Sequence, residues 1–161
     1  MPAVPSRTGR TQPRVFAEYN YASGNKNPDS KTWGTHDQIY PSAHDQMSFA
    51  DQFGWRNIED LRTGVDEKVG SKWTLTERFD DFWLATRNDA VYASSGAAIA
   101  ANPAATSSHL GEELDLIAEY KDNKHVNYGL GLAHLFTGKY LKEASHGKDY
   151  NYPFASVTYI F

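Results

Sequence analysis

The chain has 161 residues, which suits at most one domain, and it contains no cysteine, which excludes a disulfide framework and a thiolate metal site. Its formal net charge of -4 argues against a nucleic-acid partner, because such partners select basic faces. No run of about 18 apolar residues occurs, which excludes a transmembrane helix.

The composition also indicates a class of fold. Mean hydropathy is low, at -0.64, although 14% of the residues are aromatic. A polar average with many aromatic residues is typical of a transmembrane β-barrel. There, lipid-facing apolar residues alternate with polar lumen residues between two aromatic girdles.

The first segment, residues 1–14, mixes prolines with arginines and lacks an apolar stretch of signal-peptide length. We expect residues 1–14 to form a flexible tail. Residues 15–161 would then form the β-barrel domain.

Six segments alternate between apolar and polar residues with a period of two, which indicates strands. The clearest is RVFAEYNYASG, in which Val15, Ala17, Tyr19 and Tyr21 share one face. The others are NIEDLRTGVDEK, KWTLTERFDDFWLA, ELDLIAEYK, VNYGLGLAHLF and YNYPFASVTYIF. We therefore expect an all-β fold, an antiparallel up-and-down transmembrane β-barrel with about six strands.

The connections between these segments alternate in length. Those near residues 23–56, 87–109 and 138–149 are long, whereas VGSK and KDNK are short polar turns. Outer-membrane barrels show this asymmetry, with short periplasmic turns and long outer loops. We expect the long connections to be solvated loops, parts of which can fold into the lumen.

The stretch THDQIYPSAHDQ lies in the first long connection and holds His36, Asp37, Tyr40 and His44. Histidine and carboxylate together suit a zinc or iron site. Such residues are also common in loops held by side-chain hydrogen bonds and a Tyr-Pro turn. We favour the second interpretation, an extracellular loop motif without a metal.

Several motifs follow one another in a recognisable order: YNYASGNKNPDS, HDQIYPSAH, RNIEDLRTGV, LTERFDDFWLA, GEELDLIAEY, GLGLAHLFTGKYLK and TYIF. In this order they resemble the C-terminal portion of the alginate-export family of outer-membrane β-barrels. The resemblance implies a porin-like pore in the outer membrane of a Gram-negative-type bacterium, surrounded by outer-membrane lipid. In the members that give the family its name, the pore passes an anionic uronate polysaccharide through a basic lumen.

The carboxyl terminus alternates like the last strand of an outer-membrane barrel, with Val157, Tyr159 and Phe161 on one face. A terminal aromatic residue after such alternation is the signal that the barrel-assembly machinery reads, so this machinery is an expected partner. An ordinary last strand of a soluble β-protein is the alternative.

Inward-facing positions should line the pore. They carry a mixed, rather acidic set of side chains: Glu18, Asp60, Arg62, Arg78, Asp80, Glu113, Asp115 and Glu119. Arg62 and Arg78 are candidates for contacts with an anionic solute, because guanidinium pairs well with carboxylate. They could instead only balance the lumen carboxylates. An acidic lumen conducts a polyanion poorly, so alginate does not follow from these residues.

Two features depart from the family pattern. Glu59, Glu67, Glu77 and Asp81 fall on the face that should contact lipid, where an acidic group is unfavourable. Six strands are also fewer than the eight of the smallest single-chain barrels. Either the long loops hide two more strands, or copies of the chain associate as a homo-oligomer, or the chain is a fragment of a larger barrel.

Three classes of function compete. The first is a channel for passive diffusion or export of polar or anionic solutes. The second is a small β-barrel, soluble or membrane-associated, that binds a ligand in its interior. The third is an enzyme that uses His134, His146 or the His36/His44 loop, but no nucleophile motif or phosphate loop supports it. We favour the channel, and we expect neither catalysis nor a cofactor.

Overall fold

The computed structural model describes residues 11–39 and 47–161. One antiparallel sheet of six strands dominates them, in the order β1-β2-β3-β6-β7-β8. The strands are β1 (Gln12–Ala22), β2 (Ile58–Val69), β3 (Trp73–Leu84), β6 (His109–Lys121), β7 (Val126–Thr137) and β8 (Tyr150–Tyr159). Every strand pairs with its nearest sheet neighbour along the chain, which is the predicted up-and-down arrangement.

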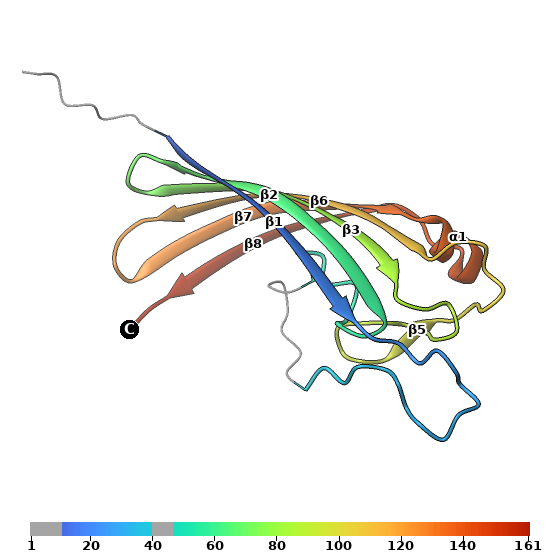
Figure 1. Cartoon of the computed structure of the whole chain (residues 1–161). Coiled ribbons are helices and arrows are strands. Elements are labelled where there is room, and N and C mark those ends of the chain that lie inside the picture. The colour runs from blue at the N-terminus through green and yellow to red at the C-terminus, as the bar shows by residue number, and fades with distance from the viewer. Residues whose placement is uncertain (1–10, 40–46) are drawn as a thin grey trace, which may run out of the picture.

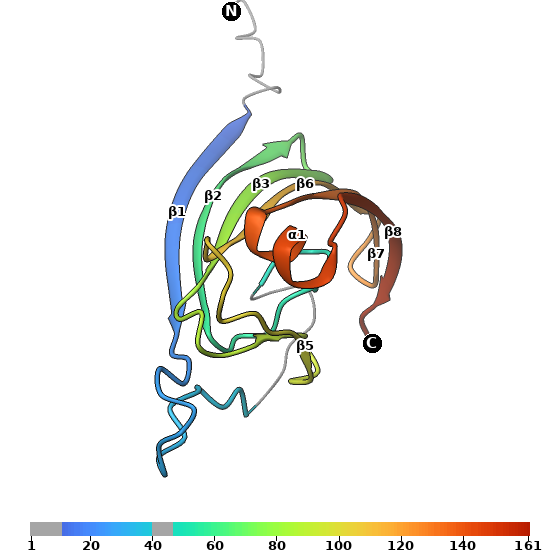
Figure 2. The same ribbon diagram turned by 90° about the vertical axis from the view of Figure 1, so that its right-hand side faces the viewer.

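The sheet is strongly curved but open. It forms an arc, seen end-on in Figure 2, whose concave side holds the helix and parts of the loops. Within the described residues β1 pairs with β2 alone and β8 with β7 alone, so no closed barrel forms. Strands β4 (Val91–Tyr92) and β5 (Ala98–Ala100) do occur in a long loop, as one alternative predicted. They form a separate two-stranded sheet and do not extend the arc.

Long and short connections lie at opposite ends of the sheet (Figure 1). Residues 70–72 and 122–125 form the short turns, and the chain ends on that side. The other end carries the long connections 23–57, 85–108 and 138–149. The predicted asymmetry is therefore confirmed. The third long connection, expected to be a solvated loop, contains the helix α1 (Lys139–Ser145).

The tail prediction needs one correction. Strand β1 begins at Gln12, so Pro13 and Arg14 belong to the sheet and not to a tail. An edge strand accommodates proline, because half of its backbone groups face away from the sheet. Thr11 precedes the strand, and residues 1–10 of the predicted tail lie outside the described residues.

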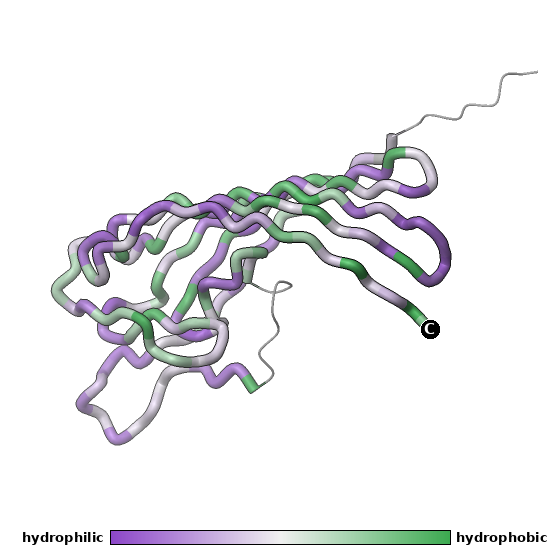
Figure 3. The backbone as a smooth tube through the Cα atoms, turned by 180° about the vertical axis from the view of Figure 1, so that it is seen from behind, coloured by the Kyte–Doolittle hydropathy of each residue, from purple (hydrophilic) through white to green (hydrophobic). Residues whose placement is uncertain are grey.

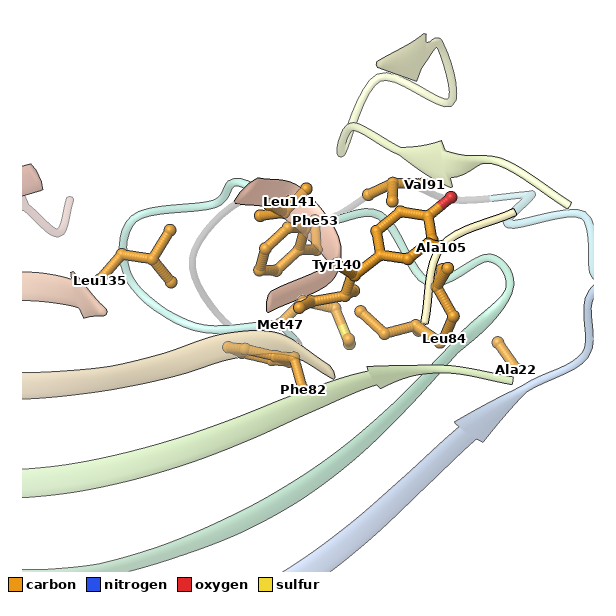
Figure 4. Close-up of a cluster of buried hydrophobic side chains, with 12 residues drawn as sticks. Ala22, Met47, Phe53, Phe82, Leu84, Val91, Ala105, Leu135, Tyr140 and Leu141 are labelled. Carbon is orange, nitrogen blue, oxygen red and sulfur yellow. The ribbon is translucent and has the colours of Figure 1, made fainter. Parts of the chain in front are cut away.

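A hydrophobic cluster joins the long connections to the loop end of the sheet (Figure 4). Tyr140 and Leu141 of α1 point into it together with Met47 and Phe53 of the first long connection. The Phe53 ring meets Phe82 of β3 edge-on, with ring centroids 5.1 Å apart. The loops are thus anchored to the sheet by apolar burial, which is the main stabilising contribution in such contacts.

A β-bulge interrupts the pairing of β3 and β6 between Phe82 and Trp83. Gly111 adopts φ of 150° there, and a Cβ at that position would lie 2.4 Å from the Phe136 carbonyl oxygen. The bulge therefore requires glycine. Below it, the register is unbroken and the alternation of hydropathy along each strand gives the sheet two different faces (Figure 3).

Candidate functional site: the concave face

The register places all eight predicted pore-lining residues on the concave face. Glu18, Arg62, Asp80 and Glu113 are successive partners across β1, β2, β3 and β6. Arg78 faces Asp115 in the neighbouring row. Asp60 and Glu119 lie on the same face, Asp60 towards the long loops and Glu119 towards the short turns.

Arginine and aspartate side chains form a continuous ladder across these strands. Arg62 Nε donates to Asp80 Oδ1 at 2.6 Å, and Arg78 Nε lies 3.1 Å from Asp80 Oδ2. Arg78 also donates to Asp115 Oδ2 from Nε at 3.0 Å and from Nη2 at 2.7 Å. Asn20 of β1 continues the ladder with a 3.1 Å bond to Asp60. Charge-assisted bonds of this kind are short and strong.

The ladder is buried and its charges do not balance. Asp60, Asp80, Glu113 and Asp115 are all 0% exposed, and Arg62 and Arg78 are 5% and 8% exposed. Four carboxylates against two guanidinium groups leave an excess of two negative charges when all are ionised. Because the two arginines are enclosed and paired, the geometry favours the charge-balancing interpretation over direct contact with a solute.

A segment of the first long connection, residues 47–53, covers the ladder. The Ala50 backbone N–H donates to Glu113 Oε1 at 2.9 Å. Phe49 stacks on Phe154 of β8, with centroids 4.4 Å apart, and the Arg78 guanidinium lies 5.3 Å from the Phe49 ring centre. The sequence suggested that a loop could enter the lumen, but no local pattern identified which residues would do so.

The outer parts of the loops are tied together at Asp89. Its carboxylate accepts bonds from the Asn25 N–H at 2.7 Å, the Thr35 hydroxyl at 2.5 Å and the Tyr92 hydroxyl at 2.8 Å. Burial alone would raise the pKa of Asp89, but these donors outweigh it and the pKa is lowered. Asp89 therefore joins the first long connection to the second as a carboxylate.

The predicted loop motif is only partly described. His36 and Asp37 are exposed; Asp37 forms an ion pair with Arg56, and the His36 ring lies 6.0 Å from the Trp55 ring. Tyr40 and His44 lie outside the described residues. Among the residues that are described, the group that could hold a metal ion is instead Asp81, His109 and Glu112, beside the bulge.

Arg14, predicted to lie in the tail, presents an accessible guanidinium on the concave face. Its side chain is 73% exposed, and it donates to Asp66 Oδ2 at 2.6 Å from Nη2. Lys68 and Lys121 lie on the same face towards the short turns and are exposed. This end of the concave face therefore presents exposed cationic side chains, and the acidic side chains of Asp66 and Glu119 lie between them.

The convex face is apolar and exposed. Its exposed side chains include Val15, Leu61, Val65, Leu75, Phe79, Leu116, Leu130, Leu132, Val157 and Tyr159. The register confirms that Glu77 stands among them, between Val65 and Leu116. A groove of about 580 Å³ runs past these three residues. Val157, Tyr159 and Phe161, the predicted assembly signal, are exposed at the β8 edge.

A curved antiparallel sheet with a charged concave face, an apolar convex face and loops of unequal length is the architecture of an outer-membrane β-barrel wall. The family model for alginate export matches residues 7–155, and the chain belongs to that family of outer-membrane transport channels. No curated protein and no solved structure matches the chain. In the described part of the chain, no helix has the length and apolar character needed to span a membrane.

Proposed function

We propose that the chain forms part of the wall of an outer-membrane channel that passes polar or anionic solutes, with a uronate polysaccharide as the preferred substrate class. The observation that carries this proposal is the opposition of the two faces. Large apolar side chains cover the convex face, and the ionic ladder occupies the concave one. Such a surface suits lipid on one side and water on the other.

The proposed channel is closed by strands beyond this arc or by further copies of the chain. An open arc in lipid would leave the outer backbone groups of β1 and β8 without partners, each at a cost of several kcal/mol. Val157, Tyr159 and Phe161 would be read by the barrel-assembly machinery. The bacterium would be of the Gram-negative type, with the long loops facing outward.

The accessible cations give the solute preference a physical basis. Arg14, Lys68 and Lys121 are exposed on the concave face, whereas Arg62 and Arg78 are enclosed in the ladder. A uronate chain that enters from the short-turn end would meet these three exposed cations before it reached the ladder. Guanidinium and ammonium groups in a narrow aqueous passage attract anions over about 10 Å at 0.1 M salt.

Planar-bilayer conductance tests the proposal on the protein folded in detergent, after a gel has shown that boiling shifts its mobility. We expect current steps that a uronate oligosaccharide blocks, and weaker block in Arg14→Gln. Lys31→Gln is the matched control, because Lys31 is an exposed cation of the first long connection. Folded, inserted protein without conductance would contradict the channel. A monodisperse protein without detergent would favour the soluble, ligand-binding alternative.

A further inference from the structure

Glu113 is a buried carboxylate that pairs with no basic side chain of the described residues. It is 0% exposed, and among the residues that the structure describes it forms no ion pair with lysine or arginine. Its Oε1 accepts the Ala50 N–H, but within the described part of the chain its Oε2 has no hydrogen-bond donor. A buried charge in this state is unfavourable by several kcal/mol unless a counter-charge or a proton compensates it.

Other oxygen atoms without donors surround this carboxylate. Glu113 and Asp115 are two residues apart on one face of β6, and within the described residues Asp115 Oδ1 is likewise buried without a donor. Ser48, two residues before the Ala50 N–H that binds Glu113, is 0% exposed, and its hydroxyl has no hydrogen-bond partner among the described residues. Tyr150 lies in the same cross-strand row as Glu113, on the far side of Leu135, and its hydroxyl also has no hydrogen-bond partner within the described residues. The ligand atoms that the described residues offer in this group are therefore oxygens.

The charge of the ladder also leaves these carboxylates without enough positive partners. Arg78 binds Asp115 through Oδ2, which leaves Oδ1 available, and Arg62 is engaged with Asp80 and Asp60. When all of them are ionised, the four buried carboxylates exceed the two guanidinium groups by two charges. One divalent cation would neutralise that excess.

We propose that Glu113 Oε2 and Asp115 Oδ1, with hydroxyl oxygens of Ser48 and Tyr150, bind one divalent cation of the calcium class. Hard cations take oxygen ligands, and calcium accepts irregular sets of six to eight oxygens at 2.3–2.6 Å, whereas magnesium requires a near-ideal octahedron and retains its waters. Because Ala50 also bonds to Glu113, the bound cation would hold residues 47–53 against the sheet.

Calorimetric titration of the chelator-treated, detergent-folded protein with calcium chloride tests this inference. We expect one calcium per chain, with at least tenfold weaker binding in Glu113→Gln and in Asp115→Asn. The amide introduced by Glu113→Gln retains an oxygen for the Ala50 N–H, and the mobility shift on boiling shows whether each variant folds. Two variants are used so that the test still holds if one of them fails to fold.

Glu112→Gln is the matched control. Glu112 is the sequence neighbour of Glu113 but lies with Asp81 and His109 beside the bulge, so its replacement should leave calcium binding unchanged. Absence of binding at millimolar calcium, unchanged binding in Glu113→Gln, or loss in Glu112→Gln would each overturn the inference. The inference does not depend on transport: a protein that conducts without binding calcium refutes the cation site alone.

Discussion

Removal of the Arg78 guanidinium should strongly destabilise the sheet. Arg78 is 8% exposed and is shared between Asp115, at 2.7 Å, and Asp80, at 3.1 Å, both of which are 0% exposed. In Arg78→Met these two carboxylates lose a buried counter-charge. Breaking a buried pair in this way costs roughly 3–5 kcal/mol. That is a large share of a total stability of about 5–15 kcal/mol.

Urea unfolding in detergent micelles, followed by tryptophan fluorescence, measures this loss, and a chelator keeps calcium out of the comparison. The control is Arg14→Met, which breaks an ion pair whose arginine is 73% exposed. Because solvent screens that pair, its loss should cost about 0–1 kcal/mol. Equal losses in the two variants would refute the argument from burial.

The double variant Arg78→Met with Asp115→Leu distinguishes two causes of the stability loss. One is the lost attraction between the partners, and the other is the buried charge that Arg78→Met leaves without a counter-charge. Replacing both members of a buried pair by apolar groups is often close to neutral. We therefore expect the double variant to recover most of the stability that Arg78→Met loses. If the double variant lost as much free energy of unfolding as the two single variants together, this explanation would be contradicted.

Three further predictions concern the convex face and the loops. Glu77→Leu should stabilise the protein in lipid vesicles by about 1–2 kcal/mol, because an acidic group on the lipid face is unfavourable. The shift of the urea unfolding midpoint measures this effect. An unchanged midpoint would mean that Glu77 contacts a protein partner or water and not lipid. Asp89 has a lowered pKa, so its stabilising effect is complete above its ordinary value of 3.8 and is lost as the pH falls through the lower folded-state pKa. Cleavage of the first long connection by pepsin should therefore accelerate below about pH 4 in the wild type. In Asp89→Asn the same connection should already be cleaved rapidly at about pH 5. If the variant showed the wild-type pH profile, Asp89 would not hold the two connections together. Ala50→Pro removes the N–H that binds Glu113 and should raise single-channel conductance, whereas Gln52→Pro, two residues away and exposed, should change it less.

The sequence predicted the strands and their faces well because alternation is a local property. Each residue of β2 and β3 takes its face from its neighbours, so period two assigned Arg62, Arg78 and Asp80 to one side of the sheet. Alternation says nothing of how far an arc closes, since closure depends on strands that do not adjoin in the chain. Six predicted strands were too few for a single-chain barrel and left hidden strands, association of copies and a fragment as alternatives, and alternation could not choose among them.

The covered ladder and the helix were missed for related physical reasons. Contacts of Phe49 and Ala50 with Phe154 and Glu113 join residues that are far apart in sequence, and no short motif encodes them. Helix α1 has seven residues and no side-chain cap at Gly138, so its helical character comes from the burial of Tyr140 and Leu141. Arg14 was misassigned because the prolines before it suggested a tail.

The strictly sequential pairing of the sheet has a consequence for the order in which it can assemble. Each strand needs only its neighbour along the chain, so the sheet can grow one hairpin at a time. The hairpins joined by the turns 70–72 and 122–125 close the shortest loops, whereas β1 must return across residues 23–57. Loop-closure entropy increases with loop length, by about 0.6 kcal/mol for each doubling. Strand β1 should thus dock last.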